Sequence, residues 1–167
     1  MENTESLLKM NNKYNKTLPA ELKEKINTLF DEGSKFQMGH KNLKAVNGYM
    51  KAYELLPAPK DQWSYALSLI RNIAENYFLK AFFDSKSVEE SKKYYHLTLK
   101  YFERYMEYKG NIGHAYNHGR IGQIWFELGE FENAKEELLR AYMDSGMEWF
   151  EKLDPKYYEL IKPIVAK

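Results

Sequence analysis

Apolar side chains in this chain recur every three or four residues from residue 19 almost to the C-terminus. Leu22, Ile26 and Leu29 begin the pattern, and each later stretch repeats it until a Pro or a Gly interrupts it. Such spacing lines apolar side chains along one face of an α-helix. The period of two that is typical of a half-buried strand is absent over any useful length of the sequence. The sequence therefore predicts an all-α fold.

Helix-breaking and helix-capping residues divide the chain into pairs of helices. Pro19 suits the first turn of a helix, and Gly39 marks a tight turn inside the first pair. Asp61 is a predicted N-cap, and Ser87 with Glu90 three residues later is typical of a capping box. We predict a polar, partly disordered leader, three helix hairpins and a last helix, at residues 1–18, 19–57, 61–109, 113–145 and 147–165.

Composition limits the class of protein. The chain of 167 residues is long enough for one domain with a core, so residues 19–167 are predicted to form a single helical domain. The absence of Cys rules out disulfides and thiolate metal sites. A formal net charge of +1 provides no excess of positive charge to attract nucleic acid or an anionic membrane. No apolar run resembles a signal peptide or a membrane span, so we expect a cytoplasmic protein.

Two of the predicted hairpins share the spacing of their small residues. Gly33 precedes Ala45 by twelve residues, and Gly122 precedes Ala134 by the same number. Gly and Ala allow two helix backbones to approach closely, and a large side chain of a neighbouring helix fills the remaining space. The middle hairpin fits the same scheme with a five-residue insertion in its turn. The matched spacing predicts an internal repeat.

The repeat carries a resemblance to a known family. In the third hairpin the large and small packing positions are Ile121, Gly122, Trp125, Leu128, Gly129, Ala134, Leu138 and Ala141. Through these residues the hairpin resembles a tetratricopeptide repeat, and the first hairpin follows with Leu29, Gly33, Phe36, Ala45, Tyr49, Ala52 and Pro57. The resemblance implies a right-handed α-solenoid of three stacked hairpins, with the last helix covering its end.

Further segments resemble a group of small bacterial tetratricopeptide proteins, some of which accompany secreted toxins. These segments are 56–60, 119–123, 126–129, 140–143 and 154–157, and the resemblance extends from Pro19 to the C-terminus. It implies a protein that binds a protein or peptide partner, and an immunity protein that neutralises a toxin domain is one form of that role.

The resemblance also implies where a partner binds. In such a solenoid the first helices of successive hairpins line the concave face. Asn and Gln side chains can pair with a peptide backbone, and Arg71 and Arg120 can each bind a carboxylate. The register of the repeat places thirteen candidate partner-binding residues on this face: Asn27, Asp31, Ser34, Gln37, Arg71, Asn72, Glu75, Phe78, Tyr116, Asn117, Arg120, Gln123 and Glu127.

No pattern of residues predicts catalysis, a cofactor or a metal. His114 and His118 are four residues apart and can face the same way on a helix, but a third ligand is not evident and His118 falls on a packing position. Gly110 and Gly113 lack the preceding strand and the Gly-Lys-Ser/Thr ending of a phosphate loop, so we predict a turn there. We therefore expect a protein that is not an enzyme.

Two alternative functions remain open from the sequence. Tyr94, Tyr101 and Tyr108 recur every seven residues on the predicted outer helix of the second hairpin, and as exposed side chains they would favour a self-associating structural or regulatory scaffold. The histidine pair would form the centre of a metal-dependent hydrolase.

Overall fold

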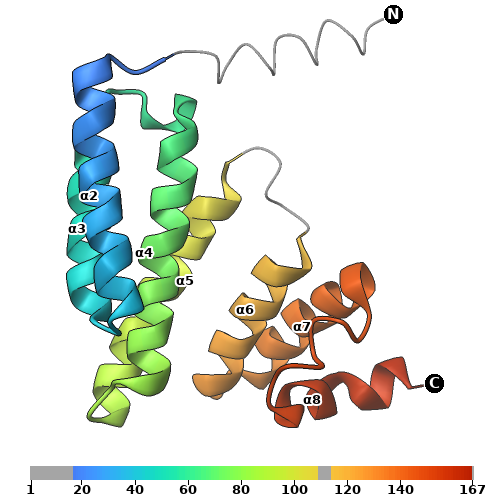
Figure 1. Ribbon diagram of the computed structural model, residues 1–167. Helices are drawn as coiled ribbons and strands as arrows, with labels where there is room; N and C mark the ends of the chain where they lie inside the picture. Colours follow the sequence, from blue (N-terminus) through green and yellow to red (C-terminus); the bar gives the residue numbers. More distant parts are fainter. Residues whose placement is uncertain (1–16, 109–113, 167) are drawn as a thin grey trace, which may run out of the picture. The chain divides into compact units, whose positions relative to one another are not determined.

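The computed structural model describes residues 17–108 and 114–166 (Figure 1). These residues form seven α-helices and one short 3-10 helix and contain no strand, which confirms the all-α prediction. No helix in the described ranges is long and apolar enough to cross a membrane. The elements are α2 (Ala20–Met38), α3 (Asn42–Glu54), η1 (Lys60–Gln62), α4 (Ser64–Phe83), α5 (Val88–Met106), α6 (Ala115–Glu127), α7 (Phe131–Ser145) and α8 (Pro155–Val165).

The chain divides into two compact units, Met1–Asp84 and Ser85–Lys167. Unit 1 contains α2, α3, η1 and α4, and unit 2 contains α5 to α8. The predicted second hairpin therefore contributes one helix to each unit. The single domain and the solenoid stay predictions.

In unit 1, α3 packs against both α2 and α4. Ala45, Tyr49 and Ala52 of α3 are almost completely buried, as expected for a helix with neighbours on two sides. Leu18, which precedes the N-cap residue Pro19 of α2, is also buried, although the predicted polar leader includes it. The rest of that leader, residues 1–16, lies outside the described residues.

In unit 2, α6 packs along α7, and α8 packs against α7. The carboxylate of Asp154 accepts a hydrogen bond from the Lys156 N–H at 3.0 Å and so caps the start of α8. That α8 covers the end of a solenoid stays a prediction. The apolar core between α7, α8 and the segment that joins them contains Leu138, Phe150, Tyr157 and Ile161.

The α2–α3 turn and the α6–α7 turn have the same hydrogen bonds. The Lys41 N–H donates to the Phe36 carbonyl at 2.8 Å, and the Glu130 N–H donates to the Trp125 carbonyl at 2.9 Å. In both turns the acceptor lies five residues before the donor. Each bond satisfies a carbonyl that the end of the helix would otherwise leave without a partner.

One residue in each turn has a left-handed backbone. The φ angle is 55° at His40 and 83° at Gly129, and each residue immediately precedes the donor of the shared hydrogen bond. The predicted tight turn at Gly39 is confirmed, but its left-handed residue is His40, since Gly39 has an ordinary φ of −85°. In this hairpin a side-chain-bearing residue takes the conformation that favours glycine.

The two hairpins also share a close contact between a glycine and a large side chain. A Cβ atom on Gly33 would lie 2.8 Å from Cε1 of Tyr49, and one on Gly122 would lie 2.7 Å from Cγ of Leu138. In both cases the large residue follows the glycine by sixteen positions. The predicted alternation of small and large residues is thus present in both hairpins, in the same register.

The predicted capping box at the start of α5 is confirmed. The Ser87 hydroxyl accepts a hydrogen bond from the Glu90 N–H at 3.1 Å. The Glu90 carboxylate in turn accepts from the backbone N–H of Lys86 at 2.6 Å. The first bond satisfies an N–H group of the first turn, and the second satisfies the N–H of Lys86, one residue before the N-cap that a standard capping box uses.

The predicted N-cap at Asp61 is wrong. Asp61 lies within the short helix η1, and α4 begins at Ser64. Between them Trp63 has an extended backbone, and its indole N–H donates to the Pro57 carbonyl at 2.8 Å. Because Trp63 has this extended backbone, α4 starts after it.

The predicted stripe of exposed tyrosines on α5 is also wrong. Tyr94 and Tyr108 are buried, and Tyr101 is half-buried. The observation that favoured a self-associating scaffold is therefore lost. The turn predicted from Gly110 to Gly113 lies outside the described residues.

Candidate partner-binding site

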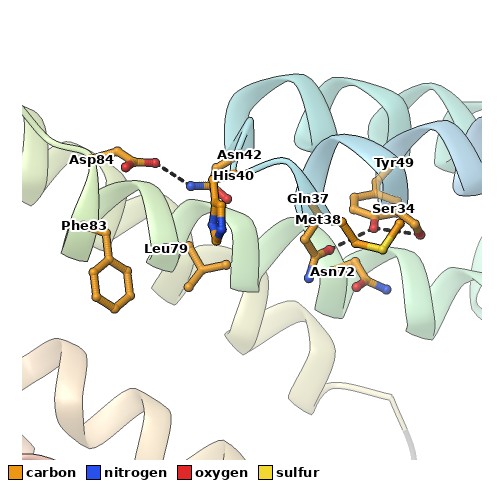
Figure 2. Close-up of a pocket in the computed structure, with 10 residues that line it drawn as sticks. All are labelled: Ser34, Gln37, Met38, His40, Asn42, Tyr49, Asn72, Leu79, Phe83 and Asp84. Atoms are coloured by element: carbon orange, nitrogen blue, oxygen red, sulfur yellow. Dashed lines mark hydrogen bonds between the residues drawn. The ribbon is translucent and has the colours of Figure 1, made fainter.

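A pocket of about 680 Å³ opens in unit 1 and is lined by residues of α2, α3, α4 and the segments that adjoin them (Figure 2). Ser34, Tyr49 and Asn72 lie toward one end of it, Phe83 and Asp84 toward the other, as Figure 2 shows. Gln37, Met38, His40, Asn42 and Leu79 complete the lining. One end of the pocket is thus uncharged and polar, and the other carries a carboxylate beside an aromatic ring.

A chain of hydrogen bonds fixes the polar end. The Tyr49 hydroxyl donates its one proton to Oε1 of Gln37 at 2.9 Å, so the Ser34 hydroxyl must be the donor across its 3.1 Å contact with Tyr49. Burial raises the pKa of the Tyr49 hydroxyl above its ordinary value, and the bond from Ser34 partly offsets this effect. The absence of a side chain at Gly33 allows the Tyr49 ring to reach this position.

Two asparagines of α4 extend this series of hydrogen bonds. The amide of Asn76 donates to Oε1 of Gln37 at 3.0 Å and to the backbone carbonyl of Asn72 at 2.8 Å. Asn72 donates to the Ser68 carbonyl at 2.8 Å. Because Asn76 is completely buried and bridges α2 and α4, it holds Gln37 at a fixed place in the pocket.

The charged end is organised around Asp84. The side-chain amide of Asn42 donates to Oδ2 of Asp84 at 2.6 Å, and the ammonium group of Lys80 donates to the Asp84 backbone carbonyl, also at 2.6 Å. Lys80 and Asn42 are both buried. The Asn42 bond ties the start of α3 to the end of α4, and the Lys80 bond satisfies a carbonyl at that end.

The pocket also exposes a considerable apolar surface. Met38 is 74% exposed and Phe83 is 70% exposed, although both side chains line the pocket. Leu79 lies between Phe83 and the polar end, whereas Met38 lies at the polar end itself, beside Gln37 (Figure 2). Exposed apolar side chains that gather around a pocket can mark a binding site.

Three of the predicted partner-binding residues, Ser34, Gln37 and Asn72, line this pocket together. The other predicted residues of unit 1 do not line it. Asn27, Asp31 and Arg71 are exposed, and Glu75 is half-buried. Phe78 is buried, so in this structure it belongs to the packing of the unit rather than to its surface.

The predicted residues of unit 2 form a connected group on α6. The guanidinium of Arg120 donates to Oε1 of Gln123 at 2.6 Å and to the Tyr116 hydroxyl at 3.3 Å, and it lies 5.5 Å from the centre of the Tyr116 ring. The Glu127 carboxylate accepts from the Tyr157 hydroxyl at 2.7 Å. Asn117 and Gln123 are buried, so their side chains serve packing and internal hydrogen bonds.

Burial and the Glu127 contact change the acidity of two tyrosines in unit 2. Burial raises the pKa of Tyr95 to about 12, and the negative charge of Glu127 adds to this effect. Burial also raises the pKa of Tyr157, and the hydrogen bond to Glu127, which requires the protonated hydroxyl, raises it further. Both groups stay neutral across the physiological range.

The two histidines considered as metal ligands have different surroundings. His114 is exposed immediately before α6, whereas His118 is buried and its Nδ1 lies 2.6 Å from Oε2 of Glu137. Within the described ranges no group of three His, Asp or Glu side chains is arranged to hold a metal ion.

Sequence reasoning missed most of the pocket. The repeat register considers only the first helix of each hairpin, so it could not select Asn42 and Tyr49 of α3 or His40 of the turn. Asn76 could have been found from the sequence. It lies four positions after Asn72, and it is a polar residue on the apolar face of α4. A buried amide at such a position is expected to bond to another buried polar group.

Comparisons of the chain with protein-family models, with curated proteins and with solved structures gave no match. The site must therefore be interpreted from its own geometry.

Proposed function

We propose that this protein is a non-catalytic interaction module that binds a segment of a protein or peptide partner in the pocket of unit 1. The observation that carries the proposal is the pairing of exposed Met38 and Phe83 with a hydrogen-bonded polar end in one pocket. Exposed apolar side chains provide binding energy when a partner covers them, and nearby amides provide specificity.

The size and rigidity of the pocket support this role. A volume of about 680 Å³ accepts a few side chains of a segment rather than a whole domain. Gln37 accepts two internal hydrogen bonds, so its amide is oriented before a partner arrives, and little conformational entropy is lost on binding.

The shared register of the two hairpins supports a tetratricopeptide-like repeat as the framework of the module. Gly33 with Tyr49 and Gly122 with Leu138 form the same kind of contact at the same spacing. We propose on this basis that the helices belong to a solenoid. A bacterial toxin domain, which the sequence resemblance favours, is then one partner to test, and the protein would be its immunity protein.

Site-specific photo-crosslinking in the host cell tests the proposal. A benzophenone amino acid replaces Met38 in one variant and Lys51 in a control, since Lys51 is exposed on α3 but does not line the pocket. We expect a discrete crosslinked partner from position 38 and none from position 51. A crosslinked species of twice the chain mass would identify a second copy as the occupant, which is the alternative of self-association.

Binding of the identified partner is then measured with purified protein. Phe83→Ala removes an exposed ring, so it should weaken binding by about tenfold or more without loss of helical circular dichroism. Asn72→Ala should weaken it less, because the amide provides one or two hydrogen bonds. Equal crosslinking from both positions, or binding that is unchanged by Phe83→Ala, would exclude this pocket as the partner site.

A further inference from the structure

Unit 2 contains a second pocket, of about 610 Å³, between α5, α6 and α7. Its apolar wall consists of Leu99, Met106, Ile121 and Trp125. The polar groups that line it are Glu103 of α5, Glu107 at the C-cap of α5, His118 of α6, and Glu137 and Arg140 of α7. None of these residues takes part in the function proposed above.

His118 presents a hydrogen-bond acceptor inside this pocket. The residue is 7% exposed, and Oε2 of Glu137 lies 2.6 Å from its Nδ1. A carboxylate can only accept, so Nδ1 carries a proton, and whenever the ring is neutral Nε2 is an acceptor. Nε2 has no partner among the described residues, yet the ring lines the pocket. A ligand that donates a hydrogen bond would satisfy it.

The charges around the pocket favour a positive ligand. Arg140 donates to Glu136 at 2.5 Å and to Glu137 at 2.9 Å, so the charge of Glu137 is compensated. Glu103 of α5 and Glu107, four residues later at its C-cap, are exposed and form no ion pair with a described residue. Three carboxylates and one guanidinium give the lining a formal charge of −3 + 1 = −2 with His118 neutral.

The arrangement fits an organic cation better than a metal ion. Metal binding requires several ligands within about 2 to 2.6 Å of one point, and in the described part of the chain no three His, Asp or Glu side chains meet in that way. The carboxylates and the imidazole are instead distributed around an apolar wall that contains the Trp125 ring. An aromatic face attracts an ammonium or guanidinium group directly.

We infer that this pocket binds an organic cation, an ammonium or guanidinium group on an apolar carrier. Its N–H groups donate to Nε2 of His118 and to the carboxylates of Glu103 and Glu107, and its carrier packs against the wall that includes Trp125. The same group occurs in free amines and in the Lys and Arg side chains of a protein, so the experiment must separate these two sources.

Titration of the full chain with butylguanidinium, followed by two-dimensional NMR, tests the inference. Butylurea is the control, because it has nearly the same shape but no charge. We expect saturable shifts of the Trp125 indole N–H with butylguanidinium and at least about tenfold weaker binding of butylurea. Equal affinities of the two probes, or no saturable shift at Trp125, would overturn the inference.

Charge-removing variants provide the matched test. Glu103→Gln and Glu107→Gln each remove one exposed carboxylate of the pocket, and Glu148→Gln removes an exposed carboxylate of unit 2 that does not line it. Each of the first two variants should bind butylguanidinium about fivefold more weakly than the original chain, and the third less than twofold more weakly. Three equal effects would show that only general attraction between charges is at work, and the site would be refuted.

A blocked amino acid separates the sources of the cation. If the pocket receives a side chain of a protein, N-acetylarginine N-methylamide should bind at least as well as butylguanidinium. If the pocket accepts only free amines, the blocked residue should bind at least about tenfold more weakly. Failure of both guanidinium probes to bind would refute the site itself, and the pocket of unit 1 would be unaffected.

Discussion

The α2–α3 and α6–α7 turns each contain one residue with a left-handed backbone, and substitutions at these two residues test how much that conformation costs. His40 has a φ of 55° at the place where the α6–α7 turn has Gly129, with a φ of 83°. We predict that His40→Gly stabilises the protein and that Gly129→Ala destabilises it. One substitution introduces glycine at the left-handed position and the other removes it, in two turns that have the same backbone hydrogen bonds.

The magnitude follows from two opposing terms. A residue with a Cβ costs about 1 to 2 kcal/mol in the left-handed region, and glycine avoids this cost. Glycine also makes the unfolded chain more flexible, which costs about 0.4 to 1 kcal/mol of stability. We therefore expect His40→Gly to raise the free energy of unfolding by about 0.5 to 1 kcal/mol. No atom lies within 4 Å of a Cβ built on Gly129, so Gly129→Ala should lower it by a similar amount through the backbone alone.

Urea unfolding followed by far-ultraviolet circular dichroism measures both changes, provided that the slope m is the same for each variant. His40→Ala is the control, because it removes the imidazole but keeps the cost of the left-handed backbone. Its stability should differ from that of the original chain by less than about 0.5 kcal/mol. The reasoning would be refuted if His40→Gly were no more stable than His40→Ala.

Three further predictions concern unit 2. Gly119→Ala should lower the free energy of unfolding by about 1 to 3 kcal/mol, because the new Cβ would lie 2.3 Å from Cε2 of Trp149, and urea unfolding with partial rescue by Trp149→Leu checks this. Tyr157→Phe should lower it by about 1 to 2 kcal/mol, since the 2.7 Å bond to Glu127 is lost, and thermal unfolding beside the Glu127→Gln variant measures the change. Tyr95 ionises near pH 10 when unfolded and at about 12 in the folded chain, so its contribution to stability is complete below pH 10 and is lost as the pH rises toward 12. Tyr95→Phe should reduce that alkaline loss of stability, and an unchanged pH profile would contradict the assignment.

Helix type and most helix ends could be predicted from local sequence. The end of α2 near Met38 and the cap at Ser87 follow from patterns within a few residues, because the groups that satisfy a helix end lie close along the chain. Asp61 shows where this reasoning fails. A contact of Trp63 with the preceding loop moved the start of α4, and no local preference contains that information.

The pocket of unit 1 could be predicted only in part. Ser34, Gln37 and Asn72 were selected because a repeat register assigns faces to the first helices. His40 lies in a turn and Phe83 at the end of α4, where a helical register no longer fixes the direction of a side chain.

The sequence by itself determined that the chain is helical, where its glycines must meet large side chains, and that no cysteine chemistry is available to it. The tertiary structure alone decided which polar side chains come together. Asn76 reaches Gln37 across thirty-nine residues, and His118 reaches Glu137 across nineteen. Such pairs depend on how helices are placed against each other, and this placement results from the packing of the whole core rather than from the periodicity of any one segment.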